Sequence, residues 1–281
     1  MTVTIAEGIL AATVDMPVPF GSVVELPSRA PDAEYAYGGD PSQRVYLWRP
    51  ESGASPATPV VVLIHGGCWM AEYGVDHIYP LASALAAAGL SVWAPEYRRL
   101  GEHGGGWPGT FEDVARSVDL LRAQQDLLLD PDNVVFVGHS AGAHLALLAA
   151  ARAAFHPEHP MHDESAFRPR GVVGLAAITH LASYGSGTTS CQRAVKELLA
   201  GSPDERPERY RLASPALLPR PVPVTLVHGP ADPIVPLDQP RAIADAEIHL
   251  VDGAGHFDLI HPGTPAFAEL LERLRSLLDD A

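Results

Sequence analysis

Short, continuously apolar runs recur along the 281-residue chain and alternate with segments of helical periodicity. A run of four to eight apolar residues bounded by glycine or proline is typical of a strand buried on both faces of a parallel sheet. Such strands are predicted at residues 60–67, 90–97, 133–138, 171–178, 222–229 and 247–253, after a half-buried strand at 43–50. The alternation predicts an α/β fold with one doubly wound, mostly parallel sheet.

Helical patterns separate these strands. They are predicted at residues 78–89, 110–124, 141–154 and 264–279. In the second of them, Thr110 stands three residues before Asp113, close to the spacing of a capping box. The gap between the strands at 171–178 and 222–229 is longer than a simple crossover needs, which predicts a small helical cap at 179–221.

The first 42 residues are rich in proline, glycine and acidic side chains and show little periodicity. They are expected to wrap the surface of the domain and not to form a domain of their own. The whole chain, 1–281, is therefore interpreted as one domain. Its 281 residues are enough for one large core.

The composition argues against several partners. The formal net charge is −15, from 34 acidic and 19 basic residues, with no basic cluster, so neither nucleic acid nor a membrane surface is expected to bind. The N-terminus lacks a basic region before its apolar stretch, and no later segment resembles a spanning helix, which favours the cytoplasm. Cys68 and Cys191 fit no CxxC pattern and are predicted to be free thiols. A homodimer stays open at this point.

A lone serine lies where a predicted strand changes into a predicted helix. Residues 138–142 read GHSAG and match G-x-S-x-G, in which flanking glycines permit a tight turn that exposes the hydroxyl of Ser140. The following helix start offers free N–H groups and the positive end of a dipole. A simple helix cap is the alternative role for this serine. The setting between strand and helix favours a nucleophile.

A serine nucleophile needs a base and an orienting carboxylate. His256 follows the last predicted strand in a glycine-bracketed loop, with His261 as the second candidate. Asp232 lies in the loop after the strand at 222–229. The order Ser140, Asp232, His256 is that of an α/β-hydrolase triad. The remaining candidates are expected to have other roles: His139, His144 and His228, and the loop carboxylates Asp238, Asp252 and Asp258, which are expected to be solvated.

An oxyanion hole requires two N–H groups. One is expected from Ala141, directly after the serine, and the other from the loop HGGCW at 65–69, where Gly66 and Gly67 let the backbone approach a substrate. Gly67 is the preferred donor. An ordinary Gly-Gly turn is the alternative.

Other features are interpreted more plainly. Five aromatic side chains in predicted loops could together line a substrate pocket: Trp69, Tyr73, Trp107, Tyr184 and Tyr210. Three histidines at 156, 159 and 162 lie on a proline-broken loop, which is not a rigid ligand set, so no metal is expected. Cys68 has no helix-start elbow of its own and is not expected to be a nucleophile.

From about residue 43 to 279 the chain resembles the α/β-hydrolases, and among them the kynurenine formamidase and small carboxylesterase group. The resemblance rests on HGGCW, on GHSAGAHLAL and on PEYRR…GGGWPGTFEDV at 95–114. The HGGCW loop differs from the HGGG loop of related esterases, because Cys68 replaces the last glycine. Either Gly67 or Cys68 therefore remains as the second oxyanion donor.

These observations predict a serine hydrolase that acts through an acyl-enzyme on a small carboxylic ester or an N-formyl arylamide, without a cofactor. The N-formyl arylamide follows from the resemblance. An acyltransferase or thioesterase is the alternative among enzymes, because an acceptor other than water can capture an acyl group. A ligand-binding protein without catalysis is the alternative outside them, and it would be expected to lack a triad member.

Overall fold

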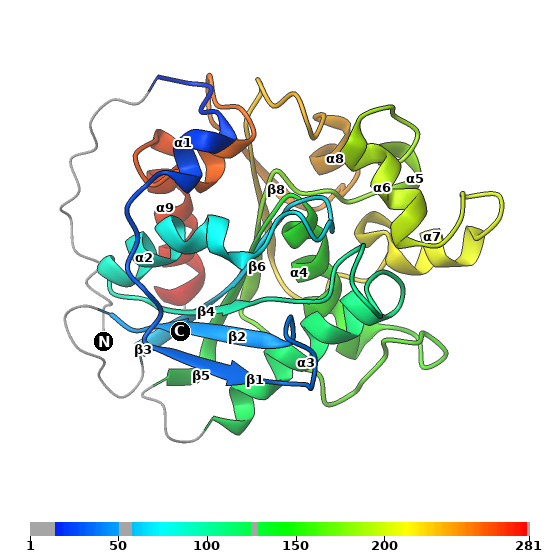
Figure 1. Cartoon of the computed structure of the whole chain (residues 1–281), viewed down its shortest axis with the longest axis horizontal. Coiled ribbons are helices and arrows are strands. Elements are labelled where there is room, and N and C mark those ends of the chain that lie inside the picture. The colour runs from blue at the N-terminus through cyan, green and yellow to red at the C-terminus, as the bar shows by residue number, and fades with distance from the viewer. Residues whose placement is uncertain (1–14, 51–57, 125–128, 280–281) are drawn as a thin grey trace.

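The computed structural model describes residues 15–50, 58–124 and 129–279, and the first 14 residues of the predicted wrapping segment lie outside it. Its centre is an eight-stranded sheet with the order β1-β2-β4-β3-β5-β6-β7-β8 (Figure 1). The strands are β1 (Ala33–Ala36), β2 (Arg44–Trp48), β3 (Thr58–Ile64), β4 (Ser91–Pro95), β5 (Leu129–His139), β6 (Gly171–Leu175), β7 (Val224–His228) and β8 (Glu247–Leu250). The two pairings of β2 are antiparallel and all the others are parallel. The predicted doubly wound, mostly parallel sheet is confirmed.

One strand was not predicted. β1 pairs antiparallel with β2 at the edge of the sheet, and its four residues alternate between half-buried and exposed. A short edge strand of this kind buries too little side chain to produce a continuous apolar run. It forms because β2 offers it an unpaired edge.

The register of the central strands aligns their carboxyl ends. Ile64 at the end of β3 pairs with Gly138 of β5, and His139 pairs with Leu175 at the end of β6. Leu175 in turn pairs with Val227 of β7. The loops that follow these parallel strands therefore emerge along one edge of the sheet, which is where open α/β sheets place their ligand sites.

Helices cover both faces of the sheet. The larger ones are α2 (Tyr79–Ala87), α3 (Gly109–Ala123), α4 (Ala141–Ala151) and α9 (Pro265–Asp279). Figure 1 shows α2 and α9 on one side of the sheet and α3 and α4 on the other. Every residue of α4 is buried, against β5, β6 and α3. This agrees with its sequence of alanine and leucine, because a helix that is apolar on all sides belongs in the interior.

The capping box predicted at Thr110 and Asp113 is wrong. The Thr110 hydroxyl donates to the carbonyl of Arg98 and accepts from the N–H of Gly106. Asp113 is fully buried and accepts two hydrogen bonds from the Arg98 guanidinium and one from Gln43. An ion pair with an element distant in the sequence therefore replaces the local cap.

The segment 179–221 carries short helices, α5 (Leu181–Tyr184), α6 (Ser190–Leu198) and α7 (Pro207–Ala213), with a 3₁₀ turn at Pro215–Leu217. Figure 1 shows these three helices grouped beyond one end of the sheet, and we call this segment the cap. A capping box does form here, because the Thr189 hydroxyl accepts from the N–H of Gln192 and the Gln192 side chain accepts from the N–H of Thr189.

Shorter helical segments complete the described chain: α1 (Phe20–Val24), α8 (Asp238–Arg241), and 3₁₀ turns at Val75–Ile78, Arg152–Ala154 and Phe257–Ile260. Within the described ranges, no helix combines the length and the apolar character that a bilayer crossing requires.

Candidate active site

Ser140 sits on a strained turn between β5 and α4. Its backbone has φ 55° and ψ −118°, in the region that residues with a side chain rarely occupy. The flanking glycines explain how the turn fits. A Cβ at Gly142 would lie 2.1 Å from the carbonyl oxygen of Ile64, and one at Gly138 would lie 2.4 Å from that of Gly142. The turn needs glycine at both positions, as the sequence motif predicts.

Asp232 and His256 are joined directly. His256 Nδ1 lies 2.7 Å from Asp232 Oδ2, and both side chains are almost fully buried. The other carboxylate oxygen, Oδ1, accepts from the backbone N–H groups of Ile234 at 2.7 Å and Val235 at 2.9 Å. These bonds fix the carboxylate, which in turn fixes the ring of His256 with Nε2 free for other partners.

Several effects act on the ionisation of Asp232. Burial acts to raise the pKa of this carboxyl, but the hydrogen bond and charge of His256 and the two backbone N–H donors outweigh it, so the pKa lies below its usual value. The carboxylate is therefore ionised at neutral pH, as an acceptor for the ring N–H must be.

Ser140 and His256 line the same pocket, of about 230 Å³. Among the described residues no hydrogen bond joins the Ser140 hydroxyl to the His256 ring, while the serine N–H is fixed by the carbonyl of Leu175 at 2.8 Å. Such bonds are often loose before a substrate is present and tighten in the complex. The structure thus brings all three predicted side chains to one edge of the sheet, with the Asp232–His256 contact formed.

The HGGCW loop lies against the serine. A Cβ at Gly66 would lie 3.1 Å from the Cβ of Ser140, so the loop and this serine are in contact there. The next three residues all have positive φ, in the left-handed region: 99° at Gly67, 55° at Cys68 and 58° at Trp69. Gly67 and Cys68 both line the pocket. Ala141, the other predicted donor, is the first residue of α4.

A buried network of ionisable side chains fixes the start of this loop. His65 Nε2 lies 2.8 Å from Glu96 Oε1, and the other Glu96 oxygen accepts from the N–H of Val75 and pairs with Arg99. Burial acts to raise the pKa of Glu96, but His65, Arg99 and the Val75 N–H lower it below its usual value. The hydroxyl of Tyr97 donates to the carbonyl of His65 at 2.8 Å, which holds the start of the loop a second time.

The walls of the pocket come from segments far apart in the sequence. One wall is aromatic: the Phe20 ring lies 5.7 Å from Tyr73 and 5.2 Å from Phe257, measured between centroids. The start of α6 supplies another wall, and His77, His139 and Ile234 also line the pocket. His77 donates from Nδ1 to the carbonyl of Gly74, and burial lowers its pKa to about 3, so this ring is neutral.

Of the five aromatic residues predicted for the pocket, the structure places Tyr73 there and the other four elsewhere. Trp69 is fully buried and packs edge-on against His144, because the left-handed loop turns it toward the core. Trp107 packs against Phe111. The hydroxyls of Tyr184 and Tyr210 donate to the carbonyls of Ile234 and Gly201, respectively, inside the cap and its border.

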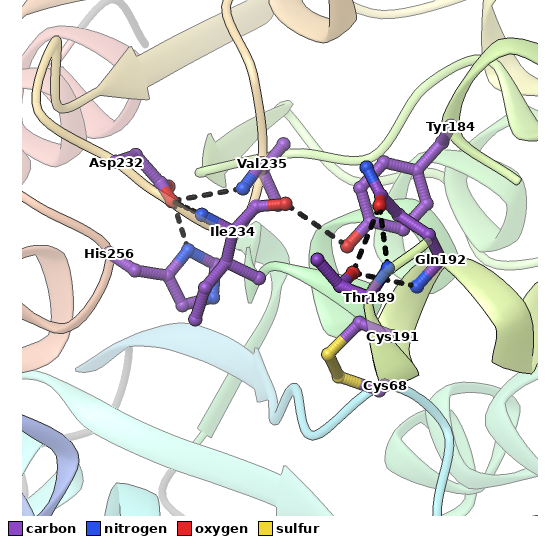
Figure 2. The surroundings of a disulfide bond; sticks show 9 residues. All are labelled: Cys68, Tyr184, Thr189, Cys191, Gln192, Asp232, Ile234, Val235 and His256. Atoms are coloured by element: carbon purple, nitrogen blue, oxygen red, sulfur yellow. Dashed lines mark hydrogen bonds and ion pairs between the residues drawn. A yellow bond between two sulfur atoms is a disulfide. The ribbon is translucent and has the colours of Figure 1, made fainter. Parts of the chain in front are cut away.

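The prediction of two free thiols is wrong. Cys68 and Cys191, 123 residues apart, form a disulfide between the HGGCW loop and the start of α6 (Figure 2). The error has a physical reason: a pair brought together only by the tertiary fold leaves no spacing signature in the sequence.

The other candidate histidines have structural contacts, whereas Asp238 and Asp252 are exposed, as expected for solvated carboxylates. His139 donates from Nε2 to the carbonyl of His256 at 3.1 Å, and burial lowers its pKa well below the usual value. His228 donates to the carbonyl of Val235. His261 accepts from the N–H of Gly263 and is not part of the pocket lining. His228 Nε2 also lies 3.9 Å from Asp232 Oδ2, beyond hydrogen-bond distance, whereas His256 Nδ1 lies 2.7 Å from it. His256 is therefore the histidine that is hydrogen-bonded to Asp232.

Asp258 differs from the expectation of a solvated charge. It is fully buried, and its Oδ2 accepts from the N–H groups of Gly255 and Val18, both at 2.9 Å. It therefore fixes the loop before His256 and ties the N-terminal segment to it. Among the described residues, no group of three His, Cys, Asp or Glu side chains is arranged to hold a metal ion.

Comparison with known proteins adds the family. The model of the BD-FAE family matches residues 45–246. Esterase LipC of Mycobacterium tuberculosis is 28% identical over 250 residues, which cover 80% of this chain and 59% of the relative. A probable isoprenylcysteine alpha-carbonyl methylesterase of Oryza sativa is 26% identical over 247 residues, covering 79% of this chain and 57% of the relative. The chain thus spans somewhat more than half the length of these curated relatives.

The solved structures agree on the architecture. Esterase B from Lactobacillus rhamnosis superposes with a TM-score of 0.75 at 21% identity, covering 92% of this chain and 89% of that one. This likeness shows a shared α/β-hydrolase fold. With a family match that extends over most of its length, the chain belongs to the BD-FAE family.

Proposed function

We propose that this protein is a serine hydrolase that cleaves a small carboxylic ester through an acyl-enzyme, with Ser140 as nucleophile, His256 as base and Asp232 as its orienting partner. The 2.7 Å contact between His256 and Asp232, beside a pocket that also contains Ser140, carries the proposal. The likeness to esterases supports it.

In the first half of the reaction, the Ser140 hydroxyl oxygen forms a bond to the ester carbonyl carbon and its proton passes to His256 Nε2. The ionised Asp232 stabilises the resulting imidazolium. Backbone N–H groups of Ala141 and of Gly67 or Cys68 receive the negative charge on the carbonyl oxygen. The tetrahedral species then collapses, and the leaving alcohol takes the proton from His256.

In the second half, water attacks the acyl carbon and gives a proton to the same nitrogen. The bond to Ser140 breaks, the serine regains its proton and the carboxylic acid leaves. The pocket size favours a small acyl group. No cofactor takes part in this scheme.

An N-formyl arylamide is the second candidate substrate. The aromatic wall of Phe20, Tyr73 and Phe257 favours a ring in the leaving group. Comparing kcat/KM for p-nitrophenyl acetate and N-formylkynurenine ranks the two classes. Added alcohol or amine acceptors test for acyl transfer by the products formed.

The disulfide bears on location. Disulfides persist most readily in oxidising compartments, so the bond between Cys68 and Cys191 weighs against the cytoplasmic location expected from the sequence.

Replacing the nucleophile tests the proposal directly. Ser140→Ala should lower kcat on p-nitrophenyl acetate by about a thousandfold or more and abolish labelling by a fluorophosphonate probe. Ser186→Ala, which changes an exposed cap serine, is the matched control and should keep both properties. Full activity in Ser140→Ala would refute the proposed mechanism.

A further inference from the structure

The only two cysteines of the chain are bonded to each other at the wall of the candidate active-site pocket. Cys68 belongs to the loop that contacts Ser140, and Cys191 is the second residue of α6. Both line the pocket. Their Cα atoms are 4.9 Å apart, within the usual range for a disulfide. The bond therefore joins the HGGCW loop, which we call the oxyanion loop, to the cap at the pocket itself.

The two ends of α6 are held differently. Val195 and Leu198 in its second half are fully buried, and the N–H of Trp107 donates to the carbonyl of Leu198 at 2.8 Å. Thr189 and Ser190 at its start are exposed, although they line the pocket. Packing thus fixes the far end of α6, while the disulfide is the covalent anchor of the end that meets a substrate.

On the other side of the contact, the loop needs no such anchor. His65 is fixed by Glu96 and by the hydroxyl of Tyr97, and Trp69 is fully buried. The N–H of Leu100 also donates to the carbonyl of Trp69 at 2.7 Å. Cys68 lies between these fixed points. The loop is therefore the rigid partner, and the start of α6 is the part that the disulfide restrains.

The cap also borders the loop after β7 that holds Asp232, which we call the acid loop. The Tyr184 hydroxyl of α5 donates to the carbonyl of Ile234, whose N–H donates to Asp232 (Figure 2). Figure 2 shows the Asp232–His256 pair on one side of Ile234, and Tyr184 and the disulfide on the other. The cap is thus restrained at two points, by the covalent bond to Cys68 and by the 3.3 Å hydrogen bond to Ile234.

We propose that the Cys68–Cys191 disulfide is a positioning element that sets the width of the substrate pocket and thereby selects short acyl chains. The proposal rests on the proposed ester hydrolysis for its substrate class. With the bond intact, the start of α6 stays against the oxyanion loop and excludes long chains. With the bond open, this end of the helix moves, longer chains enter, and short ones are held less well for attack.

Reduction opens the bond without touching other residues, because the chain has no further cysteine. A dithiol such as dithiothreitol supplies two electrons and two protons, leaving two cysteine thiols and a cyclic disulfide of the reagent. The assay compares kcat and KM for p-nitrophenyl acetate, butyrate and octanoate before and after reduction, below the melting temperature of the reduced form.

For the reduced protein we expect kcat/KM on the acetate to fall about tenfold, mainly through kcat, because a misplaced wall loosens the attack geometry. We expect the ratio of octanoate to acetate to rise about fivefold, since the wider pocket admits additional methylene groups. Cys191→Ser should match the reduced wild type. Cys68→Ala/Cys191→Ala should respond to neither oxidant nor reductant, which controls for effects of the reagent.

A merely stabilising cross-link predicts something else. It would lower the melting temperature on reduction, because a link across 123 residues constrains the unfolded chain, but it would leave the chain-length ratio unchanged below that temperature. That result overturns the proposal. So does mass spectrometry that finds two alkylatable thiols in the unreduced, denatured protein.

Hydrogen–deuterium exchange separates this proposal from the proposed function. Reduction should speed exchange at the start of α6, residues 189–193, and leave the buried strand β5 unchanged. If no ester is cleaved and no fluorophosphonate labels Ser140, the hydrolase proposal fails, and the exchange data still decide whether the disulfide positions α6. Unchanged exchange at 189–193 overturns the positioning role in either case.

Discussion

Ser140 directly follows β5 of the central sheet, Asp232 lies in the loop after β7, and His256 lies in the loop after β8. By contrast, Phe20, Thr189 and Ser190 line the same pocket from short helical segments outside the sheet. The first group inherits its position from strands that pair in register, of which β5 and β7 are buried at their carboxyl ends and β8 is exposed at the sheet edge. The second group depends on a five-residue helix and on the first turn of α6.

The two groups differ in what holds them. The turn at Ser140 is fixed by backbone atoms that leave no space for a Cβ on either flank. By contrast, α1 has no side-chain cap, and an added Cβ at its Gly21 would meet nothing within 4 Å. We infer that substitutions near the proposed reacting groups cause large losses of activity or stability, and that substitutions in the pocket walls cause small ones. The following predictions test this difference.

The largest effect is expected from Asp232→Asn. Asparagine keeps the size of the side chain but removes the charge that stabilises an imidazolium at His256, so kcat on p-nitrophenyl acetate should fall by about a thousandfold to ten thousandfold. Thermal unfolding followed by circular dichroism checks that the variant is folded. A decrease smaller than tenfold in a folded variant would mean that the acid loop is no more critical than the pocket walls.

The three residues of the proposed triad could be recognised in the sequence for a local reason. A buried strand, a tight glycine turn and a helix start are encoded within ten residues around Ser140, and the loops holding Asp232 and His256 are recognisable from the strands before them. The strand edges fix where these side chains lie. The turn at Ser140 could therefore be predicted without knowledge of long-range contacts.

The walls could not be predicted in the same way. The disulfide joins residues 123 positions apart, and Phe20 reaches the pocket from a segment that a hydrogen bond between the Val18 N–H and Asp258 ties to the loop before His256. Trp69 was expected in the pocket, but three left-handed residues in succession turn it into the core. Each of these outcomes depends on tertiary packing, which periodicity and motif spacing do not report.

A pair of glycine substitutions compares the two regions with the same chemical change. By helix propensity alone, Gly142→Ala would stabilise the protein by about 1 kcal/mol. The added Cβ would lie 2.1 Å from the carbonyl oxygen of Ile64 and 2.3 Å from that of His65, so the clash should dominate. We expect a net loss of about 3 kcal/mol in the free energy of unfolding by urea.

Gly21→Ala is the matched control in α1, where the added methyl group has open space. It should leave stability unchanged or raise it by less than about 1 kcal/mol. Equal destabilisation by the two substitutions would contradict the idea that the turn at Ser140 is tightly packed and that α1 is not.

The smallest effect at neutral pH is expected where the two regions meet, at His144 of α4. Its Nε2 donates at 2.8 Å to the carbonyl of Ala213, at the end of α7 in the cap. Burial lowers the pKa of this ring to about 4, and the hydrogen bond to Ala213 only partly opposes that effect. The ring is therefore neutral in the folded protein, and it faces the rings of Trp69 and Phe111.

Because the unfolded chain binds a proton at His144 near pH 6.5 and the folded chain does so only near pH 4, stability is complete above pH 6.5 and declines between these values. At pH 4 the loss from this residue reaches about 3 kcal/mol, and at pH 7 it is close to zero. His144→Gln keeps an N–H donor for Ala213 but cannot titrate. Urea unfolding at pH 7 and pH 4 should therefore show a smaller decrease in stability for the variant than for the wild type. Parallel decreases in the two proteins would mean that His144 already accepts a proton in the folded state, and that the contact between α4 and the cap is looser than its buried geometry indicates.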